Sequence, residues 1–362
     1  MKAAVCYAFG QPLVIEDLVL DPPQTGEVQV DIRAVAICHS DVSLIRGHWR
    51  GWSSAVPVLA GHEAAGVVAA VGPGVTTVRP GDPVVVSLLR SCGRCFACTQ
   101  GAPFLCEGKF ALQTEKRLHR RDGQPINQGI STGAFAEAVV VDQSQVVAIA
   151  ADMPLDRACL LGCGVITGLG AVTNTAQVTP GSSVVVVGTG GVGLNSVQGA
   201  ALSGAHPIIA VDVLPAKLAA ARQFGATDGV NPQDSDLAAE IRALTHGRGA
   251  DYAIITVGNP AAVNQALSYV RRGGTIVAVG MPPTGAAATV PVGDFVYMGQ
   301  KLLGSNIGST RLAVDIPRLV ALYQSGRLKL DELITQRYRL EDINDAVAAM
   351  ERGEALRNVI VF

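Results

Sequence analysis

A glycine-rich loop between a β-branched run and an apolar helical stretch is the feature that most constrains the fold. Residues 183–187 read SVVVV, which is typical of a buried parallel strand, and GTGGVG follows at 188–193. In such a loop Gly188 permits a tight turn, Gly190 lets the backbone approach a pyrophosphate, and Gly193 allows close packing of helix on strand. The sequence therefore predicts a dinucleotide site at Gly188, Gly190, Gly191, Val192 and Gly193.

A second strand at residues 208–211 ends at Asp212, where the fingerprint requires an acid about 20 residues on. A carboxylate there accepts both ribose hydroxyls of NAD and repels the 2′-phosphate of NADP. The alternative is a solvated acid that caps a helix beginning at Pro215. Because the acid stands at the position that the fold needs, we predict NAD as the cofactor.

Strands and helices continue to alternate after this unit. We predict strands at 229–230, 252–257, 275–279 and 301–304, and helices at 236–245 and 261–271. Six strands with intervening helices indicate a doubly wound, parallel α/β sheet of the Rossmann type.

Four cysteines stand close together in SCGRCFACTQGAPFLC, with the spacing Cys-x2-Cys-x2-Cys-x7-Cys. Thiolates from one such loop can converge on a tetrahedral ion, and four of them leave no open position. The alternative is a pair of disulfides, but no other feature of the sequence indicates an oxidising compartment. We predict a structural zinc site formed by Cys92, Cys95, Cys98 and Cys106.

A second set of metal-ligand residues is spread over AICHSD, AGHEAAG and LGCGVITG, namely Cys38, His62, Glu63 and Cys163. A single cysteine is usually a small buried hydrophobe, and a single histidine is usually a loop residue. Two sulfur ligands and one nitrogen ligand, however, leave a fourth zinc position open for water or substrate. Beside a zinc lobe and an NAD fingerprint, this set predicts a catalytic zinc.

The bulk composition excludes other classes of function. The net charge is −2, with 28 basic and 30 acidic side chains, which argues against nucleic acid or an anionic membrane as the main partner. Apolar runs are broken by Gly and Pro before they reach the ~18 residues of a membrane span. The N-terminal residues show no signal-peptide pattern, so we expect a cytoplasmic protein.

The motifs at Cys38, His62 and Cys163, the four-cysteine lobe, GTGGVG and the C-terminal LRNVIVF occur together. With them the sequence resembles the zinc-dependent medium-chain alcohol dehydrogenases almost from end to end. The resemblance implies a GroES-like, β-rich catalytic domain at both chain ends around a Rossmann domain. The expected bounds are 1–164, with the zinc lobe at 88–110, then 165–306 for the Rossmann domain and 307–362 for the return to the catalytic domain.

The resemblance also assigns roles around the catalytic zinc held by Cys38, His62 and Cys163. Glu63 approaches the metal transiently, and Asp41 orients the zinc histidine. Zinc lowers the pKa of the alcohol, Ser40 carries the departing proton outward, and hydride passes to the nicotinamide. Cofactor contacts are expected from Lys217 at the adenosine ribose and from His39 and Arg357 at the pyrophosphate.

The sequence departs from the family pattern at several positions. Ser43 replaces the histidine that often ends the proton relay. Within the glutathione-dependent formaldehyde and benzyl alcohol branch that it resembles most, Phe110 replaces the arginine that binds the glutathione carboxylate. Leu88 and Gly129 or Ile130 fall where relatives often carry aromatic rings, and Trp49 and Trp52 are expected near the site mouth. The expected pocket residues are Leu88, Gly129, Ile130, Met281 and Asn306.

A wide, apolar pocket predicts bulky or aromatic alcohols and their aldehydes or ketones as substrates rather than ethanol. The main hypothesis is an NAD(H)-dependent alcohol dehydrogenase with two zinc ions per chain. A nicotinoprotein that retains its NAD and a glutathione-dependent formaldehyde dehydrogenase are alternatives, whereas complete zinc ligands disfavour a non-catalytic NAD-binding protein. A homodimer, or a tetramer, is expected to form through strand 301–304.

Overall fold

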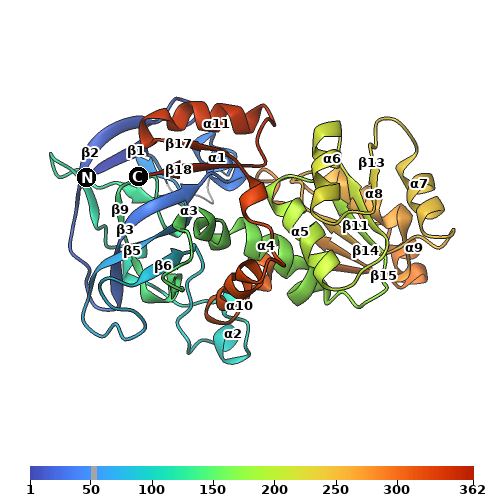
Figure 1. Cartoon of the computed structure of the whole chain (residues 1–362), viewed down its shortest axis with the longest axis horizontal. Coiled ribbons are helices and arrows are strands. Elements are labelled where there is room, and N and C mark those ends of the chain that lie inside the picture. Colours follow the sequence, from blue (N-terminus) through green and yellow to red (C-terminus); the bar gives the residue numbers. More distant parts are fainter. Residues whose placement is uncertain (50–54) are drawn as a thin grey trace. The chain divides into compact units, whose positions relative to one another are not determined.

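The computed structural model describes residues 1–49 and 55–362, so Trp52 lies outside the described residues. The chain divides into two compact units (Figure 1). The first, here called the catalytic unit, comprises Met1–Cys163 and Arg311–Phe362, and the second, the dinucleotide unit, comprises Gly164–Thr310. The predicted Rossmann domain spans 165–306.

The strands of the dinucleotide unit are β11 (Val184–Val187), β12 (Ile208–Val211), β13 (Asp228–Val230), β14 (Ala250–Ile255), β15 (Val270–Ala278) and β16 (Lys301–Gly304). They are parallel and lie in the order β13-β12-β11-β14-β15-β16. Val184, Val185 and Val186 in the central strand are fully buried, as expected for a sheet covered on both faces. The doubly wound sheet predicted from the sequence is confirmed.

The helices of this unit are α4 (Gly164–Gly170), which continues as a π-helix (Ala171–Ala176), α5 (Gly191–Leu202), α6 (Pro215–Gln223), α7 (Leu237–Leu244), α8 (Pro260–Tyr269) and α9 (Val292–Met298). The helix predicted to reach residue 271 ends at Tyr269, because Val270 already pairs with Ala250 in the sheet. Helix α9 has no counterpart in the prediction, and its Val292, Val296 and Tyr297 are exposed.

The catalytic unit is built mainly from short strands, which are β1 (Lys2–Cys6), β2 (Val14–Leu20), β3 (Glu27–Ala36), β4 (Val58–Leu59), β5 (Glu63–Val71), β6 (Pro83–Val86), β7 (Leu118–Arg120), β8 (Asn127–Gln128), β9 (Ala138–Asp142), β10 (Val146–Ala148), β17 (Ile334–Tyr338) and β18 (Arg357–Val361). In the described ranges one sheet has the order β7-β2-β1-β4-β8. The other has the order β10-β6-β5-β3-β18-β17, with β9 also paired to β3. The chain thus returns from the dinucleotide unit to add β18 beside β3.

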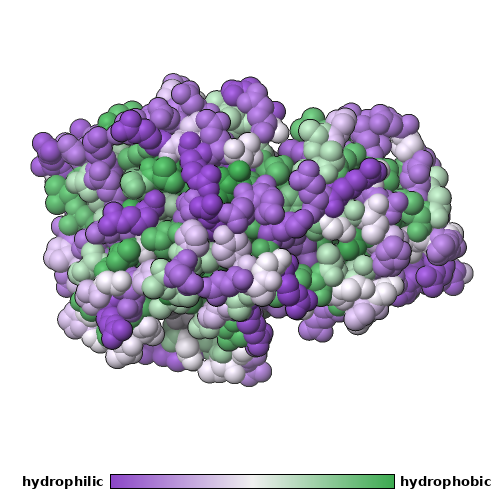
Figure 2. All heavy atoms as spheres, in the orientation of Figure 1, coloured by the Kyte–Doolittle hydropathy of each residue, from purple (hydrophilic) through white to green (hydrophobic). Residues whose placement is uncertain are grey.

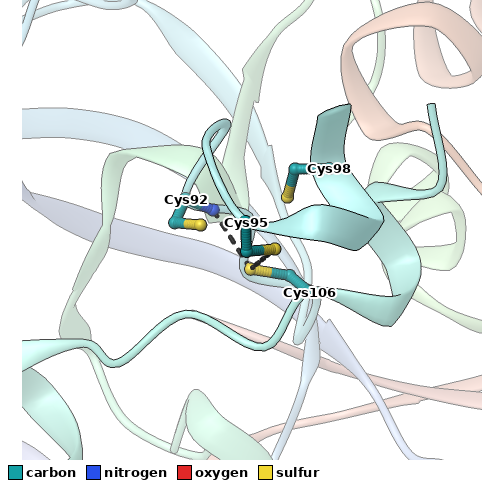
Figure 3. A group of neighbouring side chains, drawn as sticks. All are labelled: Cys92, Cys95, Cys98 and Cys106. Atoms are coloured by element: carbon teal, nitrogen blue, oxygen red, sulfur yellow. Dashed lines mark hydrogen bonds between the residues drawn. The ribbon is translucent and has the colours of Figure 1, made fainter. Parts of the chain in front are cut away.

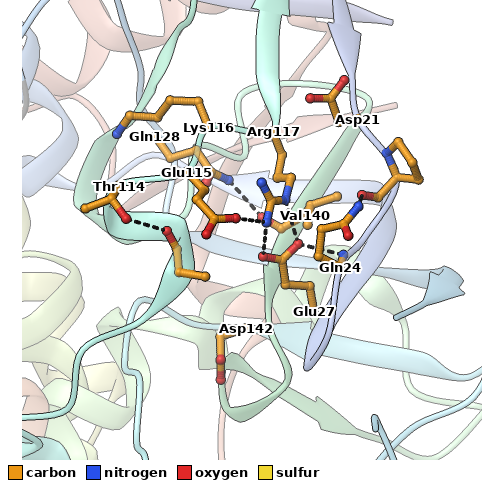
Figure 4. Close-up of polar contacts among 12 residues, drawn as sticks. Asp21, Gln24, Glu27, Thr114, Glu115, Lys116, Arg117, Gln128, Val140 and Asp142 are labelled. Atoms are coloured by element: carbon orange, nitrogen blue, oxygen red, sulfur yellow. Dashed lines mark hydrogen bonds and ion pairs between the residues drawn. The ribbon is translucent and has the colours of Figure 1, made fainter. Parts of the chain in front are cut away.

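The helices of the catalytic unit are α1 (His39–Ile45), α2 (Phe96–Thr99), α3 (Leu155–Ala158), α10 (Leu312–Gln324) and α11 (Ile343–Glu351). A buried ion pair fixes the segment before β7 to β3 (Figure 4). Arg117 Nε and Nη2 each donate at 2.9 Å to the carboxylate of Glu27, which is 2% exposed. The two-pronged contact offsets part of the cost of removing both charges from water.

Among the described helices, none is by itself long and apolar enough to cross a membrane. One bent pair, 155–162 with 164–176, meets the criteria of length and composition. Most residues of this pair are buried in the protein, as in a core helix. Figure 2 shows hydrophilic and hydrophobic residues mixed over the visible face.

Candidate active site and metal centres

The pairing of β3 with β5 brings two separated sequence motifs together. Ala36, the last residue of β3, lies opposite Glu63, the first residue of β5. Cys38 follows β3 at the start of α1, and His62 immediately precedes β5. Two residues that are far apart in the chain therefore meet at one edge of the sheet.

Cys163 lies beside Cys38 and His62 because the residue before it is Gly162. A Cβ on Gly162 would lie 2.7 Å from the Val86 carbonyl oxygen and 3.0 Å from Glu63 Cα, so only glycine allows this segment to lie so close to β5 and β6. The Sγ, ring-nitrogen and carboxylate atoms of the four clustered residues lie within 4.8 Å of one another. The cluster consists of Cys38, His62, Glu63 and Cys163, all of them buried.

Asp41 organises this cluster from the first turn of α1. Its Oδ1 accepts from His62 Nδ1 and from the Gly61 backbone N–H, both at 2.8 Å, and its Oδ2 accepts from the Cys38 N–H at 3.1 Å. Asp41 is fully buried. Because its carboxylate engages Nδ1, Nε2 is left as the ligand atom of the imidazole, which is the arrangement of a metal-binding histidine.

The electrostatics of the cluster favour a cation. The Cys163 thiol and His62 hold the pKa of Cys38 well below its ordinary value against the effect of burial. Burial lowers the pKa of His62, but Asp41 and Cys38 outweigh it, so the pKa lies well above its ordinary value. Two thiols and an imidazole nitrogen form the donor set of a catalytic zinc, so the residues fit that ion.

Glu63 faces a second charge in the same cluster. Its Oε2 pairs with Arg357 Nη2, while Glu63 Oε1 and Arg357 Nε have no hydrogen-bond partner among the described residues. Burial raises the pKa of Glu63 to about 7, although Arg357 opposes the shift. The observed partner of Arg357 is thus Glu63, whereas its predicted partner is the NAD pyrophosphate. Its unpaired Nε is buried, since Arg357 is 3% exposed.

The four cysteines of the lobe converge through their sulfur atoms (Figure 3). The sulfurs of Cys92, Cys95, Cys98 and Cys106 lie within 4.8 Å of one another, and no pair forms a disulfide. Backbone N–H groups of Cys98 and Glu107 lower the pKa of Cys95 to about 6, whereas desolvation and Cys95 raise the pKa of Cys98 to about 12. Four thiolates at this distance require a cation, so the set fits zinc.

The glycine loop in the dinucleotide unit has the geometry that the fingerprint demands. Gly188 has φ +84°, and a Cβ on Gly193 would lie 1.8 Å from the Gly188 carbonyl oxygen. A Cβ on Gly190, in contrast, would meet no atom within 4 Å. The fold itself therefore requires glycine at 188 and 193. Gly190 instead borders open space at the start of α5, where a phosphate would bind.

Asp212 stands beside this loop and is held by it. Its Oδ2 accepts from the Thr189 N–H at 2.7 Å and from Thr189 Oγ1 at 3.1 Å, and its Oδ1 accepts from the Leu214 N–H. Lys217 lies in the first turns of α6. In the catalytic unit His39 and Ser40 begin α1, with His39 exposed and Ser40 half-buried.

Two family models match the chain. They are described as "Alcohol dehydrogenase GroES-like domain", at residues 24–151, and "Zinc-binding dehydrogenase", at residues 191–325. The NDMA-dependent alcohol dehydrogenase of Amycolatopsis methanolica is 39% identical over 369 residues, covering 99% of this chain and 98% of the relative. The chain belongs to the zinc-dependent alcohol dehydrogenases. It is therefore an oxidoreductase, as predicted.

Two further similarities place this dehydrogenase among its relatives. The S-(hydroxymethyl)glutathione dehydrogenase of Paracoccus denitrificans is 36% identical over 375 residues, covering 100% of this chain and 99% of the relative. The crystal structure of benzyl alcohol dehydrogenase from Acinetobacter calcoaceticus matches with a TM-score of 0.93 and 32% identity, covering 100% of this chain and 99% of that one. The branch predicted from the sequence is confirmed.

The residues predicted to line the substrate pocket of the dehydrogenase lie in both units. In the catalytic unit Leu88 and Ile130 are half-buried, and Ile130 packs against the apolar core. In the dinucleotide unit Met281 and Asn306 are exposed. Trp49, predicted near the mouth of the site, is 6% exposed.

The predicted pocket residue Gly129 packs against the core of the catalytic unit. Gly129 is buried, and a Cβ there would lie 2.6 Å from Leu44 Cδ2 and 2.9 Å from the Leu59 carbonyl oxygen. The space beside it is therefore filled by the core of the catalytic unit. A larger side chain at this position would have to displace that core, and the assignment of Gly129 to the pocket stays a prediction.

Three polar residues near these sites were missed in the sequence. Thr189 holds Asp212, and Gln145 and Arg90 hydrogen-bond the segments next to Leu88 and Ile130. A threonine inside the glycine fingerprint was a visible signal for the first. Gln145 and Arg90 offered none, because the groups that they bond, backbone carbonyls and each other, become neighbours only in the fold.

Proposed function

We propose that the chain is an NAD-dependent alcohol dehydrogenase that holds two zinc ions. The buried cluster of Cys38, His62 and Cys163, with His62 oriented by Asp41, carries the proposal. When bound there, zinc acts as a Lewis acid toward the oxygen of the alcohol. Ser40, half-buried and two residues after Cys38, passes the alcohol proton outward to Ser43 or to water.

The glycine loop and Asp212 support NAD as the hydride acceptor. Asp212 can still accept hydrogen bonds from ribose hydroxyls, and its charge repels a 2′-phosphate. Lys217, His39 and Arg357 are the proposed further contacts of the cofactor. Replacing Asp212 with Gly is expected to reduce the preference for NAD over NADP by about 1–3 kcal/mol.

The proposed substrates are bulky, apolar or aromatic alcohols and their aldehydes or ketones. Leu88 in place of a larger ring supports this class, as does the match to a benzyl alcohol dehydrogenase. Phe110, above which Arg90 lies at 5.7 Å, stands at the position where a glutathione carboxylate would need a cation. Phe110 thus disfavours glutathione adducts as substrates. They are the second candidate because of the similarity to the S-(hydroxymethyl)glutathione dehydrogenase of Paracoccus denitrificans.

The decisive experiment uses protein washed free of exchangeable cofactor. Benzyl alcohol with added NAD should produce NADH absorbance, with a higher kcat/KM than ethanol, and metal analysis should give two zinc ions per chain. Turnover that needs a separate electron acceptor but no added NAD would instead identify a nicotinoprotein, which the name of the NDMA-dependent relative favours. Preference for S-(hydroxymethyl)glutathione would identify the second candidate.

We also propose a homodimer formed through the dinucleotide unit. Strand β16 ends the described sheet, and Leu302 on it is 37% exposed. Val296 and Tyr297 on α9 are each 72% exposed. An apolar sheet edge of this kind invites pairing with a second copy. A sedimentation mass equal to that of one 37.3 kDa chain would contradict the proposal.

A further inference from the structure

The carbonyl oxygen of Ser131 accepts two hydrogen bonds from side chains that lie elsewhere in the sequence. Arg90 Nη2 donates to it at 2.8 Å and Gln145 Nε2 at 3.1 Å. Arg90 Nε also donates to Gln145 Oε1 at 2.7 Å, so the two side chains and the carbonyl form a closed triangle. Arg90 belongs to the predicted zinc lobe, and Ser131 follows the candidate pocket residue Ile130.

The segment that contains Ser131 has an unfavourable backbone conformation. Ile130 has φ 48° and Ser131 has φ 60°, and a β-branched residue rarely adopts this left-handed region. Such a conformation is energetically costly and persists only where neighbours enforce it. Here the neighbours include Thr132, whose Oγ1 donates to the Ile130 carbonyl, and Gln128, whose Nε2 donates to the Thr132 carbonyl. Gln128 Nε2 also donates to the Val140 carbonyl (Figure 4).

Gln145 joins this turn to the residues beside the candidate catalytic zinc. Its Nε2 also donates to the Ser87 carbonyl at 2.8 Å, directly before Leu88. Ser87 Oγ in turn donates at 2.7 Å to the carbonyl of Gly162, the residue before Cys163. Gln145 and Ser87 are both fully buried, so these bonds do not compete with water.

We propose that Gln145 and Arg90 are positioning residues that set the spacing of Leu88 and Ile130 and thereby select the size of the alcohol. The inference rests on the proposed function, because Leu88 and Ile130 are pocket walls only if the chain oxidises alcohols. Neither residue touches the reacting atoms. The pair acts through the Ser87 and Ser131 carbonyls, each of which fixes the residue next to it.

Removing the Arg90 donors should release the turn. In Arg90→Met, Ser131 loses one of its two donors and Gln145 Oε1 keeps only the Asp142 backbone N–H at 3.2 Å, so Ile130 and Ser131 can relax toward negative φ. Ile130 then shifts, and a bulky alcohol that packs against it loses contact, whereas a small one loses little. We expect the ratio of kcat/KM for benzyl alcohol to that for ethanol to fall about fivefold or more, through KM, with kcat for ethanol unchanged.

The test compares Arg90→Met, Arg90→Lys and Gln145→Leu with Arg79→Met, which alters an arginine that is 86% exposed in the same unit. Lysine supplies one donor to Ser131, so Arg90→Lys should recover part of the selectivity. Arg79→Met should leave both alcohols unaffected. A parallel fall of kcat/KM for both alcohols, or an unchanged ratio, would overturn the proposal, because a merely structural role lowers both together.

A crystal structure of Arg90→Met separates this proposal from the proposed function. Negative φ at Ile130 and Ser131 supports the positioning role even if the unmodified protein oxidises no alcohol, an outcome that would refute only the function. An unchanged left-handed turn overturns the positioning role whatever the activity. Zinc content serves as the control for folding of both metal sites, and Arg90→Met takes the place of Gln145→Leu if that variant does not fold.

Discussion

The two metal-ligand sets of this dehydrogenase differ in how they are assembled and in what surrounds them. The lobe takes its cysteines from one short stretch, 92–106, and leaves them half-exposed. The other set collects Cys38, His62 and Cys163 from distant parts of the catalytic unit and buries them. Two charged side chains, Asp41 and Arg357, are held in place beside the buried set.

This difference corresponds to two roles, a structural metal site in the lobe and a catalytic metal site in the buried set. The lobe satisfies its sulfurs with backbone N–H groups and with one another, which closes the site. In the buried set, the carboxylate behind His62 fixes the ring, and Glu63 keeps one oxygen without a partner in the described residues. We infer that stability resides mainly in the first set and activity in the second, and the following experiments test that division.

Losing one ligand from each set should give the largest contrast. We expect Cys163→Ser to lower kcat by about a thousandfold or more, because several kcal/mol of transition-state stabilisation depend on the ion. Its thermal midpoint should change little. Cys98→Ser should instead lower the midpoint strongly, since zinc binding contributes to folding free energy. Metal analysis, melting curves and kinetics of both variants check this, and equal loss of midpoint in both would contradict the division.

Asp41→Asn should have the next largest effect. The amide keeps the size of the side chain but removes the charge that engages His62 Nδ1 at 2.8 Å. Loss of such a partner typically costs 10–100-fold in metal affinity or activity. Titration with a zinc-buffering chelator should show weaker binding at one site only. Asp82→Asn, near the surface of the same unit, is the control, and weakened binding at both sites would contradict the expectation.

The sequence predicted the dinucleotide unit almost element by element. Parallel strands buried on both faces leave apolar runs, and β12 and β16 match their predicted ranges. The short strands of the catalytic unit were not located individually, because their pairing joins segments as distant as β3 and β18. Its architecture came from the family resemblance alone.

The candidate sites show the same division between local and distant information. Cysteine spacing located the lobe, and residue types named the buried set, which the fold gathers within 4.8 Å. Contacts that depend on register, such as Arg357 with Glu63, could not be read from the chain. Nor could the packing of Gly129 against Leu44.

Alanine substitutions at a glycine next to each metal-ligand set should have smaller effects and allow a matched comparison. A Cβ on Gly108 would lie 2.7 Å from Cys92 Cβ, and one on Gly162 would lie 2.7 Å from the Val86 carbonyl oxygen. Each alanine substitution should cost about 1–3 kcal/mol of unfolding free energy, the usual range for overpacking. We expect Gly108→Ala to weaken zinc binding at the lobe only and Gly162→Ala to raise KM and lower kcat. The reverse assignment, measured by metal content and kinetics, would break the comparison.

The smallest expected effect is a loss of stability at acid pH. It arises at Asp156, which lies in the segment that leads to Cys163. Asp156 accepts from Arg157 at 2.7 Å and from Arg337 at 2.7 Å, and its side chain is 18% exposed. Burial alone would raise the pKa of Asp156, but the two arginines hold it below its ordinary value of 3.8. A carboxyl with a depressed folded-state pKa stabilises the protein fully above about pH 4, and this contribution is lost as the pH falls through the folded value.

Asp156→Asn should therefore cost about 1 kcal/mol near neutral pH, and the difference from the unmodified protein should shrink toward zero below about pH 4. Both proteins lose zinc-bound thiolates over the same acid range, so their difference isolates this carboxylate. Unfolding free energies from pH 6 to pH 3 provide the measurement, with Asp122→Asn, on an exposed turn, as the control. A difference that grows on acidification would mean that the arginines do not hold Asp156 ionised. Because Asp156 lies on α3, ahead of Cys163, its loss should leave lobe zinc unchanged, and zinc lost from the lobe would show that the two sets are not independent.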